Sequence, residues 1–87
     1  MVSDWLLVIT LMATKVATGT ADGEGNLIFR DGELLAVVVR LEDPMHGDLV
    51  GKWHLEAGFG PHDSGSIVFD GIDAAVEWAS GAKVAAK

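Results

Sequence analysis

An Asp31-Gly32 dipeptide separates two apolar runs, residues 27–29 and 34–39, and it restricts the possible folds more than any other feature. Asp-Gly readily supplies the positive φ angles that a two-residue type I′ turn requires, so this stretch predicts a β-hairpin. The implied register pairs Arg30 with Glu33, Phe29 with Leu34 and Ile28 with Leu35. The second strand is apolar on both faces through Val39, which is typical of a central strand covered on both sides.

A second apolar run, residues 5–13, lies near the N-terminus. It is shorter than the roughly 20 residues that a membrane-spanning helix needs, and its Val, Ile and Thr side chains favour an extended strand. The alternative is the hydrophobic region of a secretory signal, with cleavage near Gly19-Thr20-Ala21. Since Asp4 precedes the run and no Lys or Arg does, we expect a strand and a cytoplasmic protein, with secretion after cleavage as the alternative.

Residues 52–59 alternate between apolar and polar side chains. The alternation predicts a strand with one dry face, formed by Trp53, Leu55, Ala57 and Phe59, and one wet face, formed by Lys52, His54 and Glu56. Gly60 and Pro61 end this strand, and residues 66–69 form a short further strand.

A helix is expected after residue 70. Asp70 is a suitable N-cap, and Gly81 is a suitable stop at the C-terminal end. The helical spacing of Ile72, Val76 and Ala79, with Trp78 beside them, predicts the buried stripe.

The fold class that follows is α+β: an antiparallel, meander-like sheet of four to five strands, with the single C-terminal helix packed on one face. Residues 1–87 form a single domain. Residues 14–26 are expected to be a mobile loop and residues 82–87 a frayed tail.

The formal net charge of −7 limits the possible partners. The six Lys and Arg residues are scattered along the chain and form no basic stripe for phosphate backbones, so we expect no nucleic acid partner and no membrane partner. The chain has no Cys, which excludes disulfides, thiolate metal sites and a thiol nucleophile.

The three histidines, His46, His54 and His62, are candidate metal ligands, but consecutive ones are eight residues apart, which in an extended chain spans up to roughly 26 Å. The spacing of Asp22, Glu24, Asn26 and Glu33 resembles a calcium loop, yet Leu27 occupies the position where such a loop requires Gly. The adjacent His62-Asp63-Ser64 has the residue types of a catalytic triad without a nucleophile-elbow motif. We therefore expect no metal and no cofactor.

The function cannot be read from a motif, so it must be inferred from the faces of the sheet. One helix covers one face, which predicts a non-enzymatic interaction or structural domain that covers its second face as a homodimer or with a protein partner. The interface residues expected are Leu7, Ile9, Val37 and Val39. The alternative is a small-molecule-binding module with an aromatic pocket between sheet and helix, lined by Trp53, Phe59 and Trp78 and entered beside His54 or His62. A small enzyme that uses one of these two histidines is a third possibility.

Overall fold

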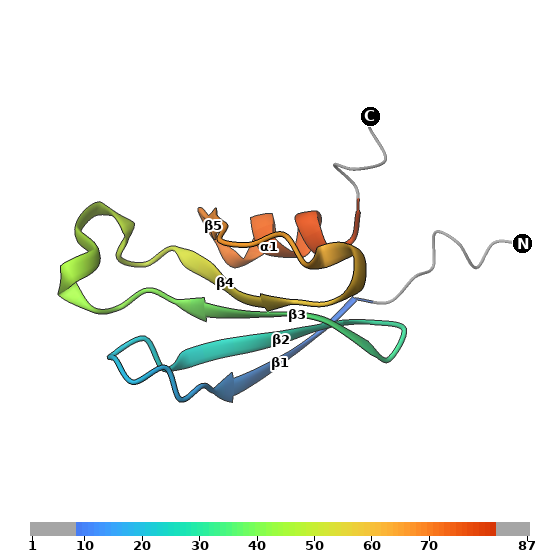
Figure 1. Ribbon diagram of the computed structural model, residues 1–87, viewed down its shortest axis with the longest axis horizontal. Coiled ribbons are helices and arrows are strands. Elements are labelled where there is room, and N and C mark those ends of the chain that lie inside the picture. The colour runs from blue at the N-terminus through green and yellow to red at the C-terminus, as the bar shows by residue number, and fades with distance from the viewer. Residues whose placement is uncertain (1–8, 82–87) are drawn as a thin grey trace, which may run out of the picture.

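A computed structural model describes residues 9–81 of the chain. It shows a five-stranded antiparallel meander in the order β1-β2-β3-β4-β5 (Figure 1). The strands are β1 (Ile9–Lys15), β2 (Glu24–Arg30), β3 (Glu33–Arg40), β4 (Trp53–Gly58) and β5 (Val68–Phe69). The helix α1 (Ile72–Ala79) follows β5. The predicted α+β class, with four to five strands and one C-terminal helix, is confirmed.

The β2–β3 hairpin turns at Asp31 and Gly32, whose φ angles of 53° and 87° give the positive values that the Asp-Gly dipeptide predicts. Arg30 pairs with Glu33 and Phe29 pairs with Leu34, as expected. Ile28 pairs with Ala36 instead of Leu35, because a β-bulge adds one residue to β3 at this point. The bulge leaves Leu35 on the helix side, packed against the core.

A second bulge interrupts the pairing of β3 with β4. Val37 lies opposite Ala57 and Val38 lies opposite Leu55, so Glu56 is the additional residue. The expected alternation along residues 52–59 is therefore wrong beyond Leu55. Because the bulge reverses the side-chain direction, Ala57 and Phe59 lie on the sheet face opposite the one that carries Trp53 and Leu55.

The helix α1 begins after Gly71, which is its N-cap and makes no side-chain capping bond. The expectation that Asp70 caps the helix is wrong, since its carboxylate accepts a hydrogen bond from Lys52 Nζ at 2.8 Å. The helix ends before Gly81, which has a φ of 83° that favours glycine.

The core lies between α1 and the β3–β5 half of the sheet, where the helix is located in Figure 1. Ala75 and Ala79 are fully buried and allow the helix to approach the strands closely. The other buried members of the core are Ile28, Ala36, Val38, Leu55 and Phe69. We name this side of the sheet the helix face.

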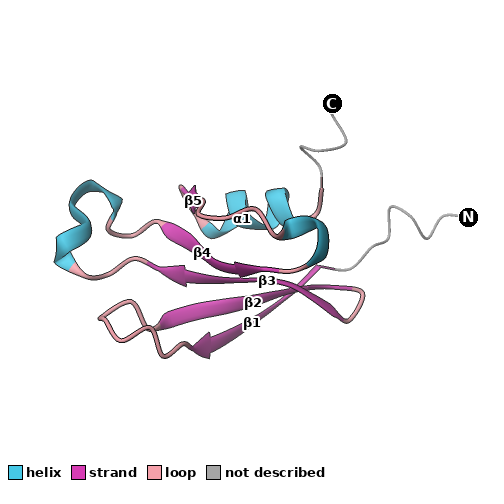
Figure 2. Cartoon of the chain, viewed as in Figure 1, coloured by secondary structure: helices cyan, strands magenta, loops and turns pink. Residues whose placement is uncertain are grey.

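Two short 3-10 segments lie at opposite ends of the sheet: η2 (Pro44–Leu49) and η3 (Gly60–His62), drawn in cyan in Figure 2. The β1–β2 connection is shorter than the loop predicted over residues 14–26, because β1 continues to Lys15 and β2 starts at Glu24. Lys15 and Glu24 are cross-strand partners and form an ion pair, which extends the two strands beyond the predicted limits. Within residues 9–81, no helix is long and apolar enough to cross a membrane.

Candidate functional site

A cavity of about 400 Å³ lies on the sheet face opposite α1. Val39 and Leu41 contribute the apolar floor, and the β1–β2 loop, η2 and β5 contribute the walls. Its polar lining residues are Thr18, Thr20, Asp22, His46, His54, Glu56 and Ser66, and its other apolar residues are Leu49 and Val68. The volume lies within the range of small-molecule sites.

Asp22 connects two of these walls. Its Oδ1 accepts hydrogen bonds from the backbone amides of Glu42 and Asp43, at 2.6 and 2.8 Å, and its Oδ2 lies 2.6 Å from Nε2 of His46. The residue is only 6% exposed. These contacts fix the β1–β2 loop to the start of η2, and residues of both segments line the cavity.

The hydrogen bond from the Glu42 amide is the main reason why the pKa of Asp22 is lowered to about 2, with further lowering by His46 and by the Asp43 amide. Burial acts in the opposite direction and is outweighed. The carboxylate is therefore ionised at neutral pH and can only accept a hydrogen bond, so Nε2 of His46 is the donor in this contact.

His54 lies at the cavity rim between two polar partners. Its Nε2 is 3.1 Å from Oγ of Ser66, and its Nδ1 is 3.4 Å from Oε1 of Glu56. His54 and Glu56 come from the same strand, and Ser66 comes from the segment that leads into β5. The side chains of His54 and Glu56 are 30% and 42% exposed, so solutes can reach this group.

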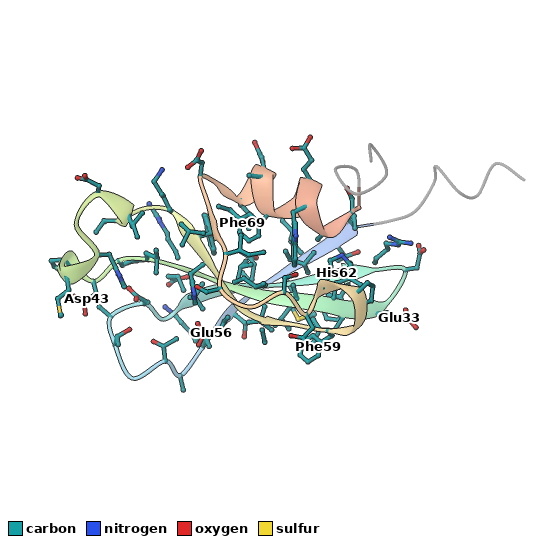
Figure 3. All side chains as sticks on the ribbon, turned by 45° about the horizontal axis from the view of Figure 1, so that its top comes forward. Glu33, Asp43, Glu56, Phe59, His62 and Phe69 are labelled. Atoms are coloured by element: carbon teal, nitrogen blue, oxygen red, sulfur yellow. The ribbon has the colours of Figure 1, made fainter. Side chains whose placement is uncertain are left out.

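The five residues expected to line an aromatic pocket are divided between the two faces of the sheet, with Trp53, His62 and Trp78 on the helix face. Trp78 packs on the helix face against the rings of His62 and Phe69, with centroid distances of 4.9 and 5.4 Å. Trp53 also packs against that core. His54 and Phe59 lie on the other side of the sheet; Figure 3 shows Phe59 and Glu56 projecting away from α1, whereas Phe69 and His62 lie close to it.

His62 has a structural role in this arrangement. Its Nε2 donates to the carbonyl oxygen of Ala79 at 2.8 Å, at the C-terminal end of α1. The ring is 9% exposed, and Nδ1 has no hydrogen-bond partner among the described residues. Ser64 Oγ donates to the His62 carbonyl, so His62, Asp63 and Ser64 do not form a triad.

The four residues expected at an interface are also divided. Leu7 lies outside the described residues, and Ile9 packs against the core on the helix face. Val39 is only 2% exposed and forms part of the cavity floor. Val37 lies on the face opposite α1 and is half-buried.

Val37 belongs to an apolar surface that continues across four strands. We name this surface the open face; it consists of Met12, Leu27, Phe29, Leu34, Val37, Ala57 and Phe59. Met12 and Phe59 are 52% and 45% exposed. The contacts of α1 with β3 and β5 are made on the helix face, so no described helix covers the open face.

The histidines and the acidic residues of residues 22–33 form no metal site in the part of the chain that is described. His46 and His54 line the same cavity, whereas His62 lies on the helix face. Asp22 is bound to backbone amides and to His46, and Glu24 is paired with Lys15, so these carboxylates do not converge as calcium ligands.

Sequence reasoning missed Asp22, His46, Ser66 and Glu56 as members of one site. The alternation of residues 52–56 does place His54 and Glu56 on one face, and an antiparallel neighbour starting at residue 66 would bring Ser66 beside them. The loop residues gave no comparable signal, since their positions depend on contacts between segments 20 or more residues apart.

Comparison of the chain with protein-family models, with curated proteins and with solved structures finds no match.

Proposed function

We propose that the protein is a small interaction domain that associates with a second copy of itself through the open face. The observation that supports this proposal is the continuous apolar surface from Met12 to Phe59, without a charged member. Such a surface is unfavourable in water and is typical of a protein contact. The cytoplasm is the proposed compartment, which suits a chain without Cys.

The dimensions of the open face indicate how strong such a dimer can be. Four strands spaced about 4.8 Å apart, with about seven residues each, cover roughly 19 by 23 Å. Because side chains project from the sheet and add to its surface, a symmetric pair buries on the order of 1,000 Å² of accessible surface in total. This area is near the lower limit for a specific interface. We therefore expect a weak dimer whose population changes over micromolar concentrations.

A second copy suits this surface because a two-fold axis places the same uncharged patch on both sides of the contact. The rest of the chain opposes association, since each copy carries a formal charge of −7. Salt screens the repulsion between exposed charges. Dimerisation should therefore become stronger as the salt concentration rises, which is the reverse of the behaviour of a protein that binds phosphate backbones.

Sedimentation equilibrium between 1 and 200 μM, at low and at moderate salt, tests the proposal. Met12→Lys places a charge in the open face at a side chain that is already 52% exposed, so the fold should tolerate it while the dissociation constant rises at least tenfold. Met45→Lys is the matched control, because Met45 is 91% exposed and lies in η2, outside the open face. A monomer at all concentrations, or equal effects of the two variants, would refute self-association.

The cavity supports a second candidate function, the binding of a small molecule. Its apolar floor and polar rim have the composition of ligand sites, although it lies opposite α1 instead of beneath it. A thermal-shift screen of small metabolites tests this candidate, since a ligand that binds the folded state raises the melting temperature. Leu49→Trp, which fills the cavity from a 40% exposed position, should abolish the shift; a shift that persists would place the binding elsewhere.

A further inference from the structure

The group at the cavity rim has the order of contacts that activates a serine. His54 stands between a hydroxyl and a carboxylate, with Nε2 3.1 Å from Ser66 Oγ and Nδ1 3.4 Å from Glu56 Oε1. In serine hydrolases the base contacts the nucleophile through one ring nitrogen and an orienting carboxylate through the other. We propose that Ser66 is an acyl acceptor toward small esters, with His54 as its general base and Glu56 as a positioning residue.

The direction of the hydrogen bond between His54 and Ser66 follows from the carboxylate on the other side of the ring. A carboxylate oxygen that lies 3.4 Å from Nδ1 favours the tautomer of His54 that carries its proton on Nδ1. Nε2 is then an acceptor, and the hydroxyl group that it contacts is that of Ser66. This is the state in which the imidazole can remove the proton from Oγ.

The cavity provides a place for the acyl group next to the hydroxyl. Ser66, His54 and Glu56 all line it, together with Val39 and Val68, which lie beside His54 in the adjacent strands. An apolar floor adjoining a nucleophile suits a short acyl chain, and about 400 Å³ is enough for an ester of modest size. The inference rests on the cavity being a small-molecule site, which is the second candidate function above.

The chemical step is an acyl transfer followed by hydrolysis. Ser66 Oγ forms a bond to the carbonyl carbon as its proton moves to His54 Nε2, and the carbonyl electron pair moves to oxygen. Collapse of the tetrahedral anion restores the carbonyl, breaks the bond to the alcohol and returns the proton from His54 to the departing oxygen. Water then attacks the acyl-Ser66 ester with the same base, which releases the carboxylic acid and restores the hydroxyl.

The adjacent Ser64 provides an internal control. It lies two residues from Ser66, but its hydroxyl donates to the backbone carbonyl of His62 and it is not among the residues that line the cavity. Both serines are exposed, so a nonspecific reagent should modify them to a similar extent. Selective reaction at Ser66 therefore reports activation by His54 instead of simple access.

The test uses the full chain with p-nitrophenyl butyrate and with a fluorophosphonate probe. The phenolate of this ester leaves without protonation, so the assay isolates attack by Oγ from the later proton return. Release of p-nitrophenol is followed by absorbance, and fragment-ion mass spectrometry locates the adduct among the serines. We expect an adduct on Ser66, and we expect Ser66→Ala and His54→Gln each to lower the rate about 100-fold or more, as loss of a nucleophile or general base does.

Two further variants separate activation from structure. Ser64→Ala should react like the unchanged protein. Glu56→Gln removes the charge that orients His54 while leaving Ser66 and His54 in place, so it should lower the rate without moving the adduct. Circular dichroism and thermal melting of each variant establish that it is folded before its rate is compared.

Any of three results would overturn the inference. The first is the absence of an adduct on Ser66, and the second is an unchanged rate of ester hydrolysis in Ser66→Ala, which would indicate attack by a histidine alone. The third is an equal loss of rate in the Ser64→Ala and Ser66→Ala variants. Saturation-transfer NMR with butyrate distinguishes a failure of acyl transfer from a failure of ligand binding in the cavity. Binding of butyrate without acylation would overturn the acyl-transfer inference and leave the cavity as a small-molecule site, whereas no binding and no acylation would overturn both.

Discussion

Gly58 lies at the point where β4 ends and η3 begins, and its replacement by alanine should test the packing of this turn. A Cβ atom at Gly58 would lie 1.8 Å from the carbonyl oxygen of His62 and 2.7 Å from its carbonyl carbon. Both are backbone atoms, so no rotation of a side chain can remove the contact. The turn must move by at least about 1.6 Å to restore an ordinary separation.

Such a movement disturbs several contacts that depend on the turn. The amide of Phe59 donates to Leu35 at 2.9 Å, which joins the turn to β3. The ring of His62 donates to Ala79 at 2.8 Å and packs against Trp78, which joins the turn to α1. Overpacking costs about 1 to 3 kcal/mol and a weakened buried hydrogen bond about 1 kcal/mol more, so we expect Gly58→Ala to lower the free energy of unfolding by about 3 kcal/mol.

Urea denaturation followed by tryptophan fluorescence measures this change, because Trp78 contacts His62 directly. A loss of about 3 kcal/mol corresponds to a decrease of roughly 15 °C in melting temperature for a domain of this size. Gly23→Ala is the control, since the nearest atom to its added Cβ is Val16 O at 3.8 Å, and it should change stability by about 0.5 kcal/mol or less. Equal effects of the two substitutions would show that the close approach at Gly58 does not determine stability.

Two further predictions concern Asp22 and His62. The pKa of Asp22 is lowered from 3.8 to about 2, so the stability that its carboxylate contributes is complete above pH 4 and is lost as the pH falls toward 2. Chemical denaturation at a series of pH values should show that Asp22→Asn removes this part of the acid dependence. Asp48→Asn, at an exposed position in η2, should preserve it. His62→Phe retains an aromatic ring beside Trp78 but leaves the Ala79 carbonyl without its donor, and thermal melting should show a loss of about 1 to 2 kcal/mol; an unchanged melting temperature would contradict a stabilising role for this hydrogen bond.

The predictable parts of the fold are those that neighbouring residues determine. The Asp31-Gly32 turn follows from the backbone preferences of two residues, and Gly81 ends α1 for the same kind of reason. The meander and the single helix follow from hydrophobic periodicity. Asp70 shows the limit of local reasoning: its residue type suits an N-cap, but its carboxylate binds Lys52, which is distant in sequence and adjacent in the folded chain.

The cavity could be predicted only in part. Strand alternation placed His54 and Glu56 on one face, which the structure retains. The contact between Asp22 and His46 could not be anticipated, because these residues lie 24 positions apart in two connections without periodicity. Loop positions of this kind are fixed by hydrogen bonds to backbone amides, and the sequence does not reveal which amides are unoccupied.

The bulge at Glu56 links the two surfaces for which a function is proposed. In a regular strand without the bulge, Ala57 and Phe59 would continue the direction of Leu55 and point toward α1. With it, His54 and Glu56 face the cavity while Ala57 and Phe59 join the open face, on the same side of the sheet. Bulges redirect side chains and are frequent beside functional sites. An irregularity of one residue therefore gives β4 a cavity rim at one end and an apolar surface at the other, and it keeps the ring of Phe59 and the methyl group of Ala57 out of a core that an eight-residue helix covers.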